Sequence, residues 1–270
     1  MPLLQHPVPF KEAIQSLADK AVTPSAMTSA QWQKIPAAIR QRAFFSATVE
    51  NARFLQSARD FIGDYLKQTV VTLPDGQKAM KAGGRGDFVT AMKEFMHKSG
   101  MERSKDESIT DVGGSARLRL IFDTQVRQAH DFGNYEQGRD PEMLNQFPAW
   151  RFIRNNAVEE PRPLHEANEG EVRLKTDTEF WLAMNSPEIG GFGVPYGPWG
   201  FNSGMDVEEV TREEAVELGL LAEDEQLEPG ELDDGEFNDG LTASMDGVDE
   251  DLQEKLKDAL GDADKFVGWD

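Results

Sequence analysis

The chain has 270 residues, with 28 Lys and Arg against 49 Asp and Glu, and no cysteine. A chain of this length buries one large core or two small ones. The absence of cysteine excludes a disulfide framework, and neither a bilayer-spanning apolar run nor a signal-peptide pattern is present. We therefore expect a soluble protein that has no membrane contact and is made in the cytoplasm.

The negative charge is concentrated in the second half of the chain. Residues 1–155 hold 21 Lys and Arg and 17 Asp and Glu, whereas residues 156–270 hold 7 and 32. Proteins bind phosphate backbones through Lys and Arg, so the acidic second half argues against DNA binding by the whole chain. The mildly basic first half still allows local contact with nucleic acid.

Hydrophobic periodicity predicts a helical N-terminal region. Phe10, Ile14 and Leu17 recur at helical spacing and indicate a short helix. From Pro36 to about Leu66 the apolar side chains advance by threes and fours, which predicts a single helix of roughly 30 residues. An aromatic stripe of this kind is more typical of a bundle core than of a partner-binding face.

A further helix is predicted to begin at Ser115, a typical N-cap residue, and to continue to about Phe132. Arg119, Asp123 and Arg127 lie four residues apart on it, so their side chains meet on one face. From spacing alone this is a surface ion ladder that stabilises the helix by a few tenths of a kcal/mol per pair.

Two short strands are predicted at residues 149–154 and 171–176, where apolar and polar side chains alternate. Between them, Arg162 lies between two prolines that stiffen the backbone, and His165 follows. Next to Glu166, this histidine fits three hypotheses: a metal ligand, a general base, or a structural histidine hydrogen-bonded to a carboxylate. A lone histidine without spaced partners is more often structural.

The segment from Gly190 to Gly204 is rich in glycine, proline and aromatic residues. Its composition excludes regular structure, yet Tyr196, Trp199 and Phe201 are too large and apolar to remain in water. We expect this segment to fold back over the strands as an ordered lid. The chain contains neither a G-x-S-x-G nor an H-E-x-x-H pattern, so no common hydrolase motif is present.

The order of these features resembles the phage Mu F-like minor head proteins of tailed phages. Such proteins carry an Arg-rich helix with an Asp-Thr pair, an aromatic strand, Arg-Pro-x-His, a segment ending in Phe-Trp and a closing Pro-Gly-Trp loop. Many relatives end that loop with Cys-x-Cys, which this chain lacks, so we expect no metal site. The matching positions are Arg119, Asp123, Thr124, Trp150, Arg162, Pro163, His165, Phe180, Trp181, Pro195, Gly197 and Trp199.

The resemblance implies a structural virion protein without catalytic residues or cofactors. It implies a place in the capsid interior with portal and capsid proteins as partners, and a role in head morphogenesis or in handling packaged DNA. It also implies an alternative to the surface ladder, in which Arg119 and Asp123 are partly buried and hold their helix against the segment from Arg162 to His165. Two other function classes remain open: a phage-linked hydrolase or toxin-like enzyme built around Arg162 and His165, and an interaction adaptor outside any virion.

The whole sequence predicts a mainly helical α+β fold in three parts. These are a helical N-terminal region at 1–110, a compact α+β module at 111–221 and an acidic tail at 222–270. High charge with low hydrophobicity predicts that the tail is disordered. Near its end, apolar residues at helical spacing predict a short helix or linear motif that docks on a partner. These residues are Leu252, Leu256, Leu260 and Trp269.

Overall fold

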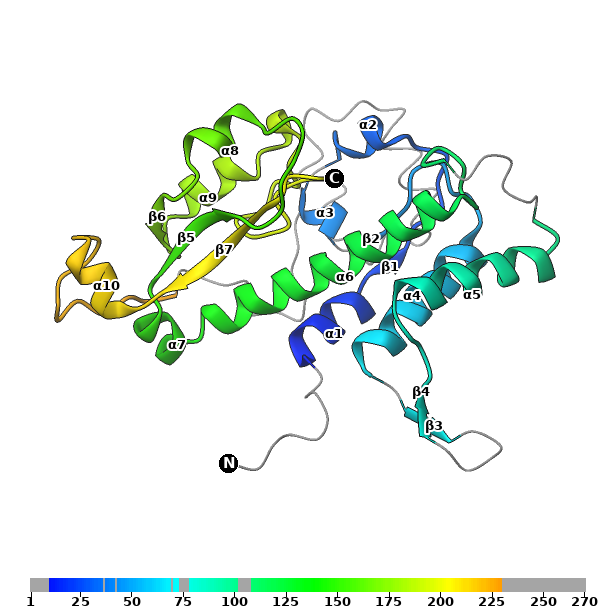
Figure 1. The fold of residues 1–270 in the computed structure, drawn as a ribbon, viewed down its shortest axis with the longest axis horizontal. Coiled ribbons are helices and arrows are strands. Elements are labelled where there is room, and N and C mark those ends of the chain that lie inside the picture. Colours follow the sequence, from blue (N-terminus) through cyan, green and yellow to red (C-terminus); the bar gives the residue numbers. More distant parts are fainter. Residues whose placement is uncertain are drawn as a thin grey trace, which may run out of the picture. The chain divides into compact units, whose positions relative to one another are not determined.

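The computed structural model describes residues 10–35, 37–41, 43–68, 70–72, 78–101 and 108–229. Over these residues the fold is mainly helical with three small sheets, which confirms the predicted α+β class (Figure 1). The chain divides into two compact units, whose described residues are 10–129 and 130–229. The sequence prediction placed a division at residue 110, whereas the two units meet inside helix α6, Ser115–Gly138.

The first unit consists of helices and two two-stranded sheets. Strands β1 and β2 pair in parallel, and β3 and β4 form an antiparallel hairpin. Besides the first part of α6, its elements are α1 (Lys11–Ala18), β1 (Ala21–Val22), α2 (Ser29–Trp32), α3 (Ala37–Gln41), β2 (Ala43–Phe44), α4 (Ala52–Leu66), β3 (Val70–Thr72), β4 (Lys78–Met80) and α5 (Arg85–Lys98).

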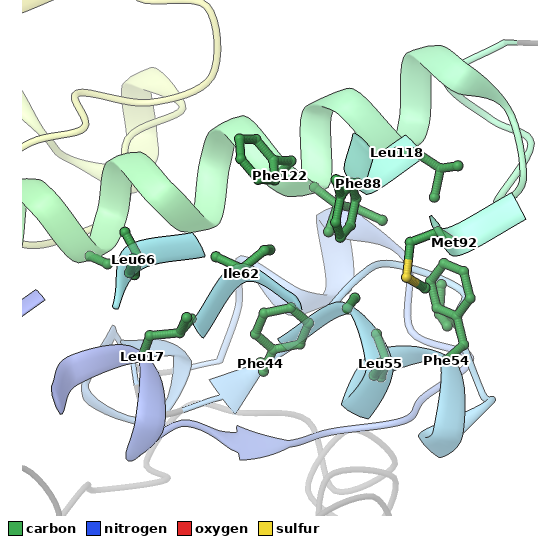
Figure 2. Close-up of a cluster of buried hydrophobic side chains, with 14 of the residues drawn as sticks. Leu17, Phe44, Phe54, Leu55, Ile62, Leu66, Phe88, Met92, Leu118 and Phe122 are labelled. Carbon is green, nitrogen blue, oxygen red and sulfur yellow. The ribbon is translucent and has the colours of Figure 1, made fainter. Parts of the chain in front are cut away.

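The core of the first unit lies between α4, α5 and α6. Ile62 on α4, Phe88 on α5 and Phe122 on α6 point toward one another in Figure 2, and all three are buried. The rings of Phe88 and Phe122 lie 5.4 Å apart, and Tyr65 lies 5.1 Å from Phe122. Each helix buries an apolar stripe, which is the packing that its sequence periodicity predicts.

The single long helix predicted for residues 36–66 is wrong. The chain leaves α3, forms β2, turns at Thr48 with a φ of +60°, and starts α4 only after Asn51, whose side chain caps the new helix. Phe44 and Val49 are nevertheless buried, because strand β1 and Ser25 pair with this segment. Apolar spacing compatible with a helix therefore arose from a strand, a turn and a helix in succession.

The second unit is built around a three-stranded antiparallel sheet in the order β6-β5-β7. After the end of α6, its elements are α7 (Pro141–Gln146), β5 (Ala149–Arg154), α8 (Pro163–Ala167), β6 (Val172–Leu174), α9 (Thr178–Met184), the 3-10 helix η1 (Pro187–Ile189), β7 (Met205–Val210) and α10 (Arg212–Glu217). Strand β5 is central; α8 lies in the connection from β5 to β6, and α9 and η1 lie in the connection from β6 to β7 (Figure 1).

Both faces of this sheet carry buried side chains. Trp150 and Phe152 on β5 belong to one cluster, whereas Ala149 and the β6 residues Val172 and Leu174 pack in another. The register explains the separation, because Ala149 lies opposite Leu174, and alternate residues of a strand point to opposite faces. The two predicted strands are confirmed: β5 contributes to both clusters, and the β6 residues contribute to the cluster of Ala149.

The predicted start of the tail at residue 222 is too early. Leu227 is buried, its N–H donates to Asn145 Oδ1 at 2.9 Å, and its carbonyl accepts from Asn145 Nδ2 at 3.0 Å. Arg212 donates to the carbonyls of Glu223 and Glu225. The disorder predicted from acidic composition is therefore wrong for residues 222–229. Residues 230–270, including Leu252, Leu256, Leu260 and Trp269, lie outside the described part of the chain.

Candidate functional site

Most of the signature residues lie in the second unit, in or beside the loop that follows η1. Arg162 is the N-cap of α8, and Pro163 is the first residue of that helix. The N–H that proline lacks would have no partner within the helix at this position. His165 is the third residue of the same helix. Trp181 lies on α9 and Trp199 lies in the loop between η1 and β7.

Arg162 connects two distant stretches of main chain. Its Nε donates to the carbonyl of Ile189 at 2.6 Å, and its Nη2 donates to the carbonyl of Phe201 at 2.9 Å. Burial lowers the pKa of the Arg162 guanidinium from its usual value. The guanidinium geometry presents several N–H groups in a fixed plane, so one side chain holds both ends of the 189–201 loop.

Glycines let the loop approach the Arg162 guanidinium closely. Gly200 has a φ of +91°, and a Cβ there would lie 2.9 Å from Arg162 Nη2 and 2.5 Å from the carbonyl oxygen of Gly190. Gly190 also has a positive φ, at +79°. Any other residue at 200 would be strained in its backbone and would collide with the loop. The glycine content of this segment is thus a packing requirement.

The His165 ring is fully buried and forms a structural contact. Its Nε2 lies 2.7 Å from the carbonyl oxygen of Met184, and because a carbonyl only accepts, Nε2 must carry the proton. Nδ1 is then an unprotonated nitrogen, and it has no hydrogen-bond partner among the described residues. The ring also meets Phe152 edge to face, with centroids 5.4 Å apart. The carboxylate partner that the sequence suggested is in fact a main-chain carbonyl.

The surroundings of His165 keep the ring neutral. Burial is the main cause that lowers its pKa, and the positive charges of Arg162 and Arg154 lower it further. The hydrogen bond to Met184 raises the pKa, and this effect is smaller than that of burial but larger than that of either arginine. A buried, neutral ring with one nitrogen committed to the backbone is poorly placed to exchange protons with a substrate.

Asn185 organises the loop and was not singled out from the sequence. It is fully buried at the end of α9. Its Oδ1 accepts from the N–H of Phe192 at 2.8 Å, and its Nδ2 donates to the carbonyl of Tyr196 at 2.6 Å. Its own carbonyl accepts from the N–H of Gly193 at 2.7 Å. An asparagine that ends a helix is common, so the sequence carried no signal that this one bonds three loop residues.

The signature tryptophans form the core beneath this loop. Trp181 and Trp199 are buried with ring centroids 5.6 Å apart, and Phe152 lies 5.2 Å from Trp199. Trp181 Nε1 donates to the carbonyl of Leu174 at 2.8 Å, so its polar group is satisfied. The predicted ordered lid is confirmed at Trp199, which is buried against the β5 side chain of Phe152. The expectation that Phe201 is buried as well is wrong, because 42% of it stays exposed.

The signature residues of α6 lie in the first unit and are largely exposed. Asp123 forms an ion pair with Arg85 at 2.9 Å, and about half of the Asp123 side chain, 49%, stays exposed. Arg119 is also exposed. The alternative in which Arg119 and Asp123 are partly buried is wrong, because the apolar stripe of α6 faces the core and these two lie off it. Arg85, which the ladder prediction did not include, is the ion partner of Asp123. Thr124 is half-buried.

The part of the chain that the structure describes lacks two features, a metal-binding cluster and a membrane-spanning helix. No group of three or more His, Asp or Glu side chains there is arranged to hold a metal ion. No helix there is both long enough and apolar enough to cross a membrane. The side chains of Arg162, His165 and Asn185 form hydrogen bonds with main-chain atoms, so their role is structural.

Comparison with known proteins adds no assignment: no family model, curated protein or solved structure matches this chain.

Proposed function

We propose that this chain is a minor head protein of a tailed bacteriophage. In this proposal it is a structural component associated with the portal and capsid proteins in the capsid interior, made in the host cytoplasm and acting in head morphogenesis. The ordered set of signature residues supports the proposal. The observation that carries it is a shared role: Arg162 holds the carbonyls of Ile189 and Phe201 at the ends of the loop, and His165 holds the carbonyl of Met184 at the end of α9 before it.

The same geometry disfavours the enzyme alternative built around Arg162 and His165. A general base must come within hydrogen-bond reach of a substrate proton, and the His165 ring is fully buried with Nε2 bonded to Met184. Two nitrogens of Arg162 are likewise occupied by main-chain carbonyls. Residues that together order a loop are expected in a protein that presents a fixed surface to its partners.

The charge distribution supports a limited role in handling packaged DNA. Among the described residues, the first unit carries 15 Lys and Arg against 9 Asp and Glu, and the second carries 7 against 22. Only the first unit has the positive excess that attracts a phosphate backbone. Contact with DNA in this proposal is therefore local and made by the first unit.

The test uses the phage whose genome encodes the chain. We expect the chain to co-purify with portal assemblies and deletion of its gene to reduce the yield of filled heads. Arg162→Gln should reduce that yield, because both carbonyl contacts of the loop are weakened. Arg173→Gln is the matched control, since Arg173 is partly exposed and contacts the Phe180 ring and Glu171 at the surface. Normal heads after deletion, with no portal association, would disprove the proposal.

A further inference from the structure

The loop held by Arg162 presents an aromatic pair at the surface. Phe201 is 42% exposed, although its size and apolarity favour burial. Phe192 packs beside it with ring centroids 5.0 Å apart. The main chain under Phe201 is fixed, because its carbonyl accepts from Arg162. An exposed aromatic on a rigid backbone loses little entropy on binding, which is the property of an interface anchor.

Four carboxylates lie close in sequence to Arg162 or to Ile189, which hold this loop. Glu188 directly precedes Ile189, which Arg162 holds, and Glu159 and Glu160 come just before the Pro161–Arg162 pair. Glu166 follows on α8. All four are exposed, and none forms an ion pair with a described residue. Other glutamates of this unit, such as Glu169, Glu208 and Glu209, are paired with Arg or Lys. We define Phe192, Phe201 and these four glutamates as the Phe201 tip.

The charge of the Phe201 tip selects its partner. Two such tips would bring unpaired carboxylates together, so a symmetric contact between tips is disfavoured. A complementary surface must combine an apolar group with positive charge. The first unit carries the positive excess of this chain, so a second copy offers that combination on a different surface, and such a contact is head to tail.

Two large apolar side chains are exposed in the described part of the first unit, Met80 at 44% and Ile109 at 50%. Met80 ends strand β4 of the hairpin that extends beyond α4 and α5 in Figure 1, and Lys81 and Arg85 follow it. Both cations are more than half exposed, at 53% and 57%, although each contacts one carboxylate within its unit. Ile109 is instead close in sequence to Asp111. We define Met80, Lys81 and Arg85 as the Met80 surface.

We propose that the Phe201 tip of one copy docks on the Met80 surface of a second copy, so that the chain associates head to tail. Phe201 contacts the Met80 thioether, a favourable sulfur–aromatic pair, and the tip glutamates face Lys81 and Arg85. The net charge of −21 opposes association at long range, but at about 0.15 M salt the Debye length is about 8 Å and the local contacts prevail. The inference does not depend on the proposed role in the phage head.

Sedimentation velocity of the full chain tests this proposal. We expect association that grows with protein concentration up to roughly 100 µM, as for a weak interface. It should weaken between 0.15 M and 1 M salt, where the Debye length falls to about 3 Å. Phe201→Ser and Met80→Asp should each weaken association at least about tenfold. Leu218→Ser and Ile109→Ser are matched controls at exposed apolar sites, 52% and 50% exposed, and should behave as the wild type.

A mixing experiment distinguishes head-to-tail from symmetric contact. Phe201→Ser retains an intact Met80 surface, and Met80→Asp retains an intact tip. An equimolar mixture of the two variants should therefore form dimers, although each variant alone is monomeric. If the mixture stays monomeric while the wild type associates, the head-to-tail contact is refuted.

A charge exchange provides the second test, which removes no apolar side chain. Glu188→Lys and Lys81→Glu should each weaken association, and the chain carrying both should recover it, because each interface again joins opposite charges. A monomeric wild type at every concentration and salt would overturn the proposal. So would equal loss in the Leu218→Ser control, or a double charge variant no better than the single ones.

Discussion

Replacement of His165 by alanine should destabilise the second unit by about 3 kcal/mol. The ring is fully buried, so its removal leaves a cavity, and the Met184 carbonyl loses its donor. The lost hydrogen bond contributes about 1 kcal/mol and the edge-to-face contact with Phe152 about 1 kcal/mol, with the cavity accounting for the remainder. For a unit of about 100 residues such a loss lowers the melting temperature by roughly 12–24 °C.

Urea unfolding followed by tryptophan fluorescence measures this loss, because Trp150, Trp181 and Trp199 all lie in the affected core. Glu166→Ala is the control, since Glu166 is exposed and should change stability by less than about 0.5 kcal/mol. A loss below about 1 kcal/mol for His165→Ala would show that the ring does not support the loop.

The pH dependence gives an independent check on His165. Its folded pKa is lowered, so below the unfolded value of about 6.5 the unfolded chain binds a proton that the folded chain resists. Stability should therefore fall as the pH falls from about 7 to 5. His165→Gln removes this titration, so the stability difference between wild type and variant should shrink or reverse at low pH. A difference that is constant with pH would contradict the argument.

Three further outcomes are expected. Lys20 is buried against Gln125 and Gln128, and burial lowers its pKa to about 8. Between pH 8 and 10 the free energy of unfolding of the wild type should therefore rise relative to that of Lys20→Met, by at most about 1.4 kcal/mol per pH unit, as measured by urea titrations. Arg162→Lys should cost about 1.5–3 kcal/mol by calorimetry, because one ammonium cannot reach both carbonyls as the guanidinium does; no change would refute the bridging role. Leu227→Ala should cost about 2 kcal/mol, and a neutral result would mean that residues 222–229 do not pack on the second unit.

Local signals predicted much of the secondary structure. The helix predicted after Ser115 and the strand at 149–154 are confirmed, because helix periodicity and strand alternation depend on neighbouring residues alone. The error at residues 36–66 has the same origin. A strand, a turn and a helix there bury apolar residues at intervals that mimic one helix, and periodicity does not detect the pairing with β1.

The sequence singled out two residues of the site, Arg162 and His165, but not their contacts. Arg162 stood out because prolines flank it, and His165 because it follows this Pro-Arg-Pro segment, but their partners lie 27, 39 and 19 residues further along the chain. Such partners are main-chain carbonyls, which every residue has, so no side-chain pattern identifies them. Asn185 was missed for the same reason. The proposed function and the head-to-tail contact stay predictions for the experiments above.

The position of β5 in the chain also affects folding during translation. Its partner β6 is translated soon after it, but its other edge pairs with β7, which begins only at Met205. At about 5–20 residues per second, that edge stays without its partner for about 3–10 s during synthesis. An unpaired strand edge is a template for pairing with other chains. Slow translation between Arg154 and Met205 should therefore lower the soluble yield, and faster codons in this stretch should raise it.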